Sequence, residues 1–169
     1  MVVVKVVDQD VSDKVDTKYI SDQFAHVKNI DIIIHCAGLV GTLDNEKLYF
    51  DANVRCTLNL IEAAQIAGVQ KFIHVSSPSI LFDFKDQFDV KEDEIPTRFS
   101  SPYARTKYLA ELAVLKAHSD IFQCLNLRPR FVLGAGDRNV LPRLLELYKK
   151  GLLVKLIGRN PLLSFTSIQ

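Results

Sequence analysis

The stretch "DIIIHCAG", residues 31 to 38, decides the fold that this sequence predicts. It is a short, continuous apolar run, which is typical of a strand buried on both faces of a parallel sheet. Similar runs occur in "KFIHVSS" at residues 71 to 77, in "FQCLNLRP" at residues 122 to 129, and in "VVVKVV" at residues 2 to 7. These runs predict the strands of one sheet.

Helical patterns alternate with the predicted strands. Apolar residues at helical spacing predict helices over residues 17–28, 44–67, 102–118 and about 139–150, and a short strand, "LVKLI", follows the last helix. Gly68 and Gly151 stand where two of these helices should end. The alternation indicates parallel βαβ units with right-handed crossovers, and therefore a doubly wound α/β sheet. Ligands bind such sheets beyond the carboxyl ends of the strands, where "CAG", "SSPS" and "RPRFVLG" should lie.

Composition and charge exclude several classes of function. The chain has 169 residues, enough for one domain, and its net charge of +1 does not support binding to nucleic acid or a membrane surface through bulk charge. Its three cysteines lack CxxC spacing, which argues against a disulfide framework or a zinc site and favours a reducing compartment. No apolar run approaches the roughly 18 residues that cross a bilayer, and no signal peptide is evident. A cytoplasmic protein is therefore expected.

A tyrosine and a lysine stand four residues apart on the predicted helix 102–118. Tyr103 and Lys107 would share one helix face, where a nearby ammonium could lower the pKa of the phenol from its usual value near 10. Ser76 and Ser77, at the end of a predicted strand, could polarise a substrate oxygen. These groups suit proton transfer at a hydroxyl or carbonyl carbon, while hydride transfer needs a cofactor. The alternative is a solvated pair on the helix surface.

Six motifs follow one another along nearly the whole chain. They are "DVSD" (residues 10–13), "DIIIHCAG" (31–38), "NVRCTLNLIEAA" (53–64), "KFIHVSSPSI" (71–80), "DEIPTRFSSPYARTK" (93–107) and "LRPRFVLGAGD" (127–137). In this order they resemble the extended short-chain dehydrogenase/reductase family, and most closely its 3β-hydroxysteroid dehydrogenase-like branch. The resemblance implies a Rossmann-type domain that binds NAD or NADP. It also implies an oxidoreductase that interconverts a secondary alcohol and a ketone, with a sterol-like 3β-hydroxyl as the expected substrate.

The resemblance also implies roles for individual residues. Tyr103 would be the acid/base, Lys107 would lower its pKa and hold the ribose hydroxyls, and Ser77 would bind the substrate oxygen. The further residues implied at the cofactor are Asp10 and Val11 beside the adenine, Ala37, Pro129 and Val132 along the cofactor, and Asn53, which would support a proton relay.

Some of these residues have simpler structural interpretations. Asp10 could be a helix N-cap or turn residue, and Asn53 could face solvent. His35 is expected to be a satisfied core residue rather than a catalyst. Either Arg128 or Arg130, which flank Pro129, could reach a phosphate or form a salt bridge. The acidic segment 83–94 is interpreted as a solvated loop face rather than a metal site.

The sequence departs from the family at its glycines. No GxGxxG or GxxGxxG fingerprint occurs in the chain, although the pyrophosphate of a dinucleotide needs such a turn. We therefore expect residues 1–169 to be a truncated domain. It would be a partial doubly wound sheet without its first two strands and glycine-rich loop, ending near the start of a substrate domain. The strand at residues 31–37 would then have an open edge, which "VVVKVV" is hypothesised to cover.

Two other classes of function remain open at this stage. One is a nucleotide-sugar epimerase or dehydratase, or a dihydroflavonol-type reductase, on the same scaffold. The other is an inactive Rossmann-type scaffold, because the glycine-rich loop is missing. A small-molecule substrate is expected in the enzymatic cases. A homodimer formed through the predicted helices 44–67 and 102–118 is also plausible from the family resemblance.

Overall fold

The computed structural model describes residues 30–40, 45–137, 140–152 and 164–168. It divides into two compact units, Met1–Arg128 and Pro129–Gln169. The predicted strand "VVVKVV", the predicted helix 17–28 and the strand "LVKLI" lie outside the described residues. The hypothesis that "VVVKVV" covers the open strand edge therefore stays a prediction.

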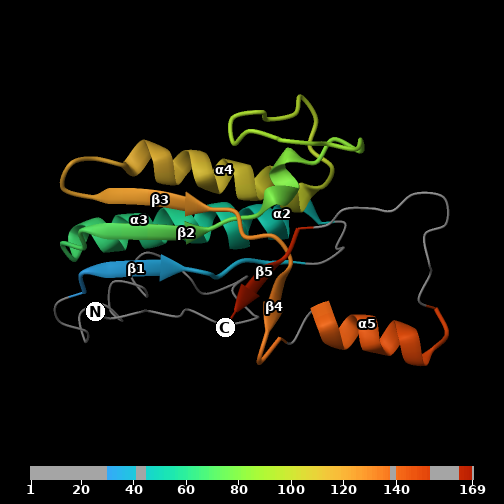
Figure 1. Ribbon diagram of the computed structural model, residues 1–169. Helices are drawn as coiled ribbons and strands as arrows, with labels where there is room; N and C mark the ends of the chain where they lie inside the picture. The colour runs from blue at the N-terminus through green and yellow to red at the C-terminus, as the bar shows by residue number, and fades with distance from the viewer. Residues whose placement is uncertain (1–29, 41–44, 138–139, 153–163, 169) are drawn as a thin grey trace. The chain divides into compact units, whose positions relative to one another are not determined.

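The first unit alternates strands and helices as the sequence predicts (Figure 1). Its elements are β1 (Ile32–His35), α2 (Glu46–Tyr49), the π-helical turn η1 (Phe50–Arg55), α3 (Cys56–Ile66), β2 (Lys71–Val75), the 3-10 turn η2 (Pro78–Leu81), α4 (Pro102–Ala117) and β3 (Gln123–Leu127).

The three strands of this unit form a parallel sheet in the order β1-β2-β3. Phe72 at the centre of the sheet pairs with Ile33 of β1 and with Cys124 of β3. The predicted parallel βαβ arrangement is confirmed for these strands. Each strand is shorter than its apolar run, because β1 ends at His35 and β2 at Val75. The residues just beyond those ends become available for a binding edge.

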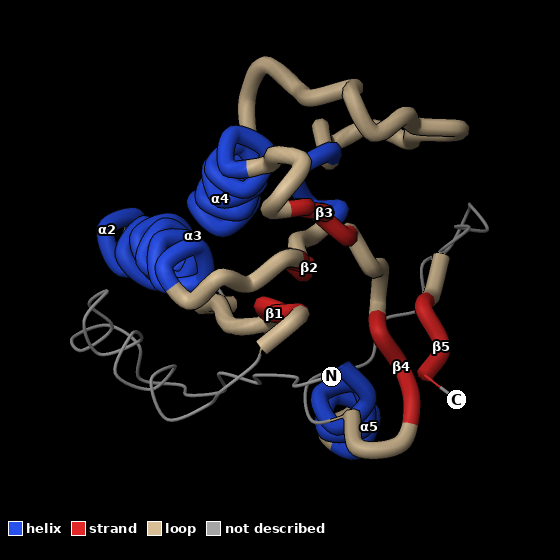
Figure 2. The backbone as a smooth tube through the Cα atoms, turned by 90° about the vertical axis from the view of Figure 1, so that its left-hand side faces the viewer, coloured by secondary structure: helices blue, strands red, loops and turns tan. Residues whose placement is uncertain are grey.

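Helices α2, α3 and α4 lie together on one side of this sheet (Figure 2). The core between helices and strands includes Ile33, Phe72, Leu60 and Val114, each at most 2% exposed. The prediction of strands buried on both faces is wrong for the part of the unit that the structure describes. Burial alternates along the strands, and Leu125 on the other face is 52% exposed. The reason is that the described helices of this unit all cover the same face.

The two long helices begin and end where their sequences indicate. The Asn45 side chain accepts a hydrogen bond from Leu48 N at 3.1 Å and caps α2, which continues through η1 into α3. Gly68 follows with a φ of 72°, the left-handed conformation that ends helices. Helix α4 is capped by Ser101, whose hydroxyl accepts from Ala104 N at 3.2 Å, and it matches the prediction for residues 102–118 closely.

The second unit contains two short parallel strands and a helix. Strand β4 (Val132–Gly134) pairs with β5 (Thr166–Ile168). Helix α5 (Val140–Lys149) matches the predicted helix, and the Asp137 carboxylate accepts hydrogen bonds from the backbone N–H groups of residues 140 and 141 at 3.0 and 2.8 Å. The apolar pattern of residues 127–137 does not by itself predict β4, because three residues are too few to show a period.

Candidate active site

The sequence-predicted catalytic residues meet at the carboxyl end of the three-stranded sheet. Ser76 and Ser77 directly follow β2, and Ala37 and Gly38 lie just beyond β1. Tyr103 lies in the first turn of α4, which packs against the same sheet. This is the edge at which parallel α/β sheets bind ligands.

The Tyr103 phenol lies between a serine and a second tyrosine. The Ser77 side chain acts on its hydroxyl, and its ring meets that of Tyr49 edge to face with the centroids 6.3 Å apart. Burial raises the pKa of Tyr103, a shift that the Ser77 hydroxyl opposes. The expected lowering of this pKa by Lys107 is therefore wrong for the structure described here. In this state Tyr103 is a protonated phenol, ready to donate a proton.

Ser77 is held by a short turn that the sequence analysis did not single out. It is the N-cap of η2, and its Oγ accepts a hydrogen bond from Ser79 N at 3.3 Å. The Ser79 hydroxyl lies 2.9 Å from the Ser77 hydroxyl. A second serine hydroxyl thus stands beside the predicted one. The signal in the sequence was the Ser-Pro-Ser pattern, in which a serine followed by proline favours an N-cap.

Lys107 is a buried residue of the helix–sheet interface. Only 4% of it is exposed, so the interpretation of Tyr103 and Lys107 as a solvated surface pair is wrong. Its Nζ donates a hydrogen bond to the carbonyl of Val75 at 2.8 Å and lies 3.1 Å from His74 Nε2. Burial lowers the pKa of Lys107 to about 8, although the Glu111 carboxylate acts in the opposite direction. The amine is therefore charged at neutral pH but close to titration.

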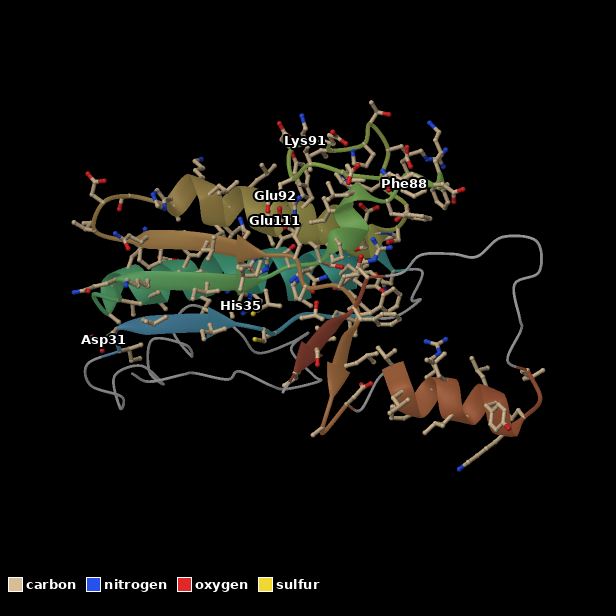
Figure 3. All side chains as sticks on the ribbon, viewed as in Figure 1. Asp31, His35, Phe88, Lys91, Glu92 and Glu111 are labelled. Atoms are coloured by element: carbon tan, nitrogen blue, oxygen red, sulfur yellow. The ribbon has the colours of Figure 1, made fainter. Side chains whose placement is uncertain are left out.

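Two histidines lie beneath Lys107. The rings of His74 and His35 stack with centroids 5.4 Å apart, and both residues are at most 2% exposed. Burial, with the Lys107 charge as a second cause, lowers the pKa of His74 to about 3. Burial also lowers the pKa of His35 well below its ordinary value, so both rings are neutral. His35 lies on β1 in Figure 3.

His35 is a core residue as expected, but it is only partly satisfied. Its Nε2 lies 2.9 Å from the Thr57 hydroxyl, which itself donates to the carbonyl of Asn53 at 2.6 Å. Nε2 is therefore the protonated nitrogen, because the only hydrogen of the Thr57 hydroxyl is already used. Within the described residues, His35 Nδ1 is buried without a hydrogen-bond partner.

Asn53 is an anchor inside the π-helical turn. It is 1% exposed, so the interpretation that it faces solvent is wrong. Its Oδ1 accepts from Leu39 N at 2.7 Å, and its Nδ2 donates to Leu39 O at 3.3 Å and to the Thr106 hydroxyl at 3.1 Å. The amide thus ties the loop after β1 to helix α4. Its role in a proton relay stays a prediction.

A buried ion pair fastens the long irregular loop to the same helix. Arg128 donates two hydrogen bonds to the Glu111 carboxylate, from Nε at 2.8 Å and from Nη2 at 2.6 Å. Its Nη1 donates to the carbonyl of Glu92 at 2.7 Å, and Glu92 and Glu111 lie close together in Figure 3. Of the two alternatives for Arg128, the structure shows the salt bridge.

The remaining predicted cofactor residues stand as follows. Ala37 is buried directly beyond β1, next to Gly38. Asp10 and Val11 lie outside the described residues. Pro129 and Val132 belong to the second unit, so their predicted contact with the cofactor stays a prediction.

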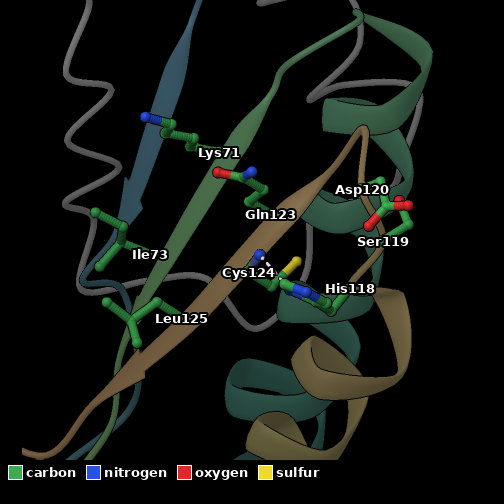
Figure 4. A pocket seen from close by; sticks show the side chains of 8 residues that line it. All are labelled: Lys71, Ile73, His118, Ser119, Asp120, Gln123, Cys124 and Leu125. Carbon is green, nitrogen blue, oxygen red and sulfur yellow. Dashed lines mark hydrogen bonds between the residues drawn. The ribbon is translucent and has the colours of Figure 1, made fainter.

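A shallow depression of about 360 Å³ lies at the other end of the sheet (Figure 4). Lys71 and Gln123, two of its lining residues, are the first residues of β2 and β3. It is therefore separate from the site around Tyr103, which lies at the carboxyl ends of the strands. None of the helices within the described ranges is both long and apolar enough to cross a membrane.

Comparison with known proteins agrees with this geometry. The model of the NAD dependent epimerase/dehydratase family matches residues 3–166. The sterol-4-alpha-carboxylate 3-dehydrogenase (decarboxylating) of Bos taurus is 34% identical over 152 residues, which are 88% of this chain and 43% of that protein. The 2-alkyl-3-oxoalkanoate reductase of Stenotrophomonas maltophilia is 33% identical over 135 residues, 78% of this chain and 41% of that protein.

Solved structures show the same fold. The UDP-glucuronic acid 4-epimerase of Bacillus cereus, in complex with NAD, is 26% identical and has a TM-score of 0.66 over 81% of this chain and 44% of its own. The chain thus spans less than half of the length of each of these relatives.

Proposed function

The chain belongs to the NAD dependent epimerase/dehydratase family, and from that premise we propose that it acts in an NAD(P)-dependent oxidoreductase that interconverts a secondary alcohol and a ketone. The observation that carries this proposal is the position of Tyr103 beside Ser77, whose side chain acts on the pKa of the phenol. It places a protonated phenol next to a hydroxyl at the carboxyl end of β2, with the Lys107 amine one turn further along α4.

The residues around Lys107 fit the sugar of a dinucleotide. The structure gives the Lys107 ammonium two acceptors, and one of its three N–H groups remains for a ligand hydroxyl. Gly38 leaves room beside it, because a Cβ at that position would lie 3.8 Å from Lys107 Nζ and 3.1 Å from Asn53 Oδ1. Bound NAD(P) would supply the hydride acceptor or donor. No glycine-rich fingerprint for the pyrophosphate occurs in the sequence.

The roles of the protein groups follow from their contacts. Ser77, supported by Ser79, would hydrogen-bond the substrate oxygen and hold it next to the Tyr103 hydroxyl. In the reducing direction, Tyr103 gives its proton to that oxygen. In the oxidising direction, the Tyr103 phenolate would take the proton, and the Lys107 charge would stabilise that phenolate once a bound ligand brings the two groups together. Loss of this proton transfer typically slows a reaction by about 10²- to 10⁴-fold.

We further propose that the substrate is a large apolar alcohol such as a 3β-hydroxysterol. Phe82 and Phe84 follow η2 directly, are 44% and 70% exposed, and have ring centroids 5.1 Å apart. They offer apolar surface close in sequence to Ser77 and Ser79. Similarity to a sterol dehydrogenase over 88% of the chain also supports this substrate class.

The test is a titration with NADH and with NADPH, followed by nicotinamide fluorescence, and then turnover of 3β-hydroxysterols. We expect saturable binding in the unchanged chain and in Tyr103→Phe, together with a fall in kcat of at least about 100-fold in the variant. Tyr108→Phe is the matched control, because the ring of this tyrosine packs against that of Phe99, with the centroids 5.3 Å apart, rather than against the site.

Three results would contradict the proposal in different ways. Turnover that survives in Tyr103→Phe would exclude the tyrosine as the acid/base. Turnover of nucleotide sugars in place of sterols would favour the epimerase alternative. A folded chain that binds neither dinucleotide would support the inactive scaffold.

A further inference from the structure

We propose that His74 is a positioning residue for the reaction: its neutral imidazole, oriented by Asn126, accepts a hydrogen bond from the Lys107 ammonium and directs that group toward the ligand. This inference rests on the proposed function for its catalytic meaning, but the hydrogen-bond network itself does not. None of the motifs that indicate the family singles out His74 or Asn126.

The Lys107 ammonium has no charged acceptor among the described residues. Its two acceptors in the described structure are both uncharged, Val75 O at 2.8 Å and His74 Nε2 at 3.1 Å. Both oxygens of the nearby Glu111 carboxylate accept hydrogen bonds from Arg128, and no ion pair joins this carboxylate to Lys107 within the described residues. The position of the ammonium thus depends on two neutral acceptors, of which only one is a side chain.

Asn126 determines the tautomer of His74. Asn126 Nδ2 donates to the carbonyl of Glu111 at 3.3 Å, which leaves Asn126 Oδ1 facing His74 Nδ1 at 2.9 Å. An amide oxygen can only accept, so Nδ1 carries the hydrogen. His74 Nε2 then has a lone pair directed at Lys107, as an ammonium requires. Asn126 thus fixes the tautomer through its hydrogen bond to Nδ1, as hydrogen-bonded neighbours of histidines do in other proteins.

The His74 imidazole is neutral in the folded protein. His74 is fully buried, and its burial and the Lys107 charge both keep it neutral. The titratable groups that act on Lys107 or on this histidine come from every neighbouring element. They are His35 and Cys36 at β1, Cys56 at α3, and Glu111 on α4. A neutral acceptor suits the site, because a carboxylate in its place would pair with the ammonium and hold it back from a ligand.

The test measures the pKa of Lys107 without any cofactor, by NMR of lysine labelled at Cε, with Lys107→Met to assign the signal. His74→Phe keeps a flat ring but removes the acceptor, whereas His74→Gln keeps an acceptor and a donor. In His74→Phe we expect the pKa of Lys107 to fall by about one unit or more from its value of about 8, because the charged form loses a hydrogen bond. His74→Gln should stay within about 0.3 units of the unchanged chain, a shift small beside one unit.

The matched control is His118→Phe. This exposed histidine follows the far end of α4 and accepts from Cys124 N at 3.0 Å, so its loss should leave Lys107 unaffected. An unchanged Lys107 pKa in a folded His74→Phe protein would overturn the proposal, as would a His74→Gln protein that behaves like His74→Phe. If His74→Phe does not fold, imidazole ¹⁵N shifts of the unchanged chain decide: a hydrogen on Nε2 of His74 would refute the network.

A second readout connects the network to the proposed function. NADH affinity should fall about tenfold in His74→Phe, because a misdirected Lys107 ammonium loses about one hydrogen bond to the ligand. The affinity should return in His74→Gln. Should the unchanged chain not bind NADH, the proposed function fails while the Lys107 titration still tests the role of His74. Equal NADH affinity in all folded variants would exclude the positioning role.

Discussion

The buried His74 should make the stability of this protein depend on pH in a window that can be calculated. Its pKa is lowered to about 3 in the folded protein from an ordinary value of 6.5. Above pH 6.5 neither state binds the proton. Between pH 6.5 and 3 the unfolded chain binds a proton that the folded protein does not, so stability falls as the pH is lowered through this window.

The size of the effect follows from these two pKa values. Between pH 7 and pH 5, the proton that His74 takes up on unfolding should lower the free energy of unfolding by about 2 kcal/mol. His35 acts in the same direction, because its pKa is also lowered. Replacing His74 by Gln removes the first contribution, while burial, the largest cause, still lowers the pKa of His35. Subtracting the pH dependence of the two proteins therefore isolates His74 from His35 and from the carboxylates.

The assay is urea unfolding at pH 7, 6 and 5, followed by far-UV circular dichroism. We expect the unchanged chain to lose about 2 kcal/mol more than His74→Gln over this range. His118→Gln, an exchange at an exposed histidine, should behave like the unchanged chain. If the unchanged chain and His74→Gln lose equal stability, His74 is protonated in the folded state, and the reasoning from burial is refuted.

Three further exchanges test the contacts around the site. Arg128→Lys keeps the charge but loses the two-pronged contact with the buried Glu111, and should lower the free energy of unfolding by about 2 kcal/mol in urea; an unchanged midpoint would contradict this. Thr106→Val removes one of the two acceptors of Asn53 Nδ2 and should cost about 1 to 2 kcal/mol, most of which Thr106→Ser restores if the hydroxyl is responsible. Gly38→Ala would bring a methyl group to 3.1 Å from Asn53 Oδ1. It should weaken NADH binding about tenfold in a fluorescence titration and leave the unfolding midpoint nearly unchanged. Equal NADH affinity in the two proteins would show that the ligand does not use the space beside Gly38.

Much of the fold could be predicted, because its signals are local. Ser101 caps α4 and Gly68 stops α3 through contacts within a few residues, so these helix ends agree with the sequence. Which faces of the strands are covered is not local. An apolar run such as residues 32–34 looks the same whether helices cover one face or two, and the answer depends on where the connections between strands pass.

The site divides in the same way. Tyr103 and Lys107 could be found because they are four residues apart on one helix. The contact of Lys107 with His74 spans 33 residues, and that of His74 with Asn126 spans 52, so no spacing rule could reveal them. The direction of the Tyr103 pKa was predicted wrongly for the same reason. The charge of a neighbour on the helix is visible in the sequence, whereas the burial that dominates here is a property of the folded chain.

The π-helical turn at Phe50–Arg55 makes this part of the chain sensitive to length. A π-turn closes its hydrogen bonds one residue later than an α-helix does, so the segment resembles an α-helix that has accepted an inserted residue. Deleting one residue there could restore a regular helix, but side chains on either side of the deletion would rotate by about 100° relative to each other. Asn53 could then not reach Leu39 while Thr57 still faces His35. In a family of such proteins, exchanges at the exposed positions of this turn should be common, and single-residue gaps should be rare.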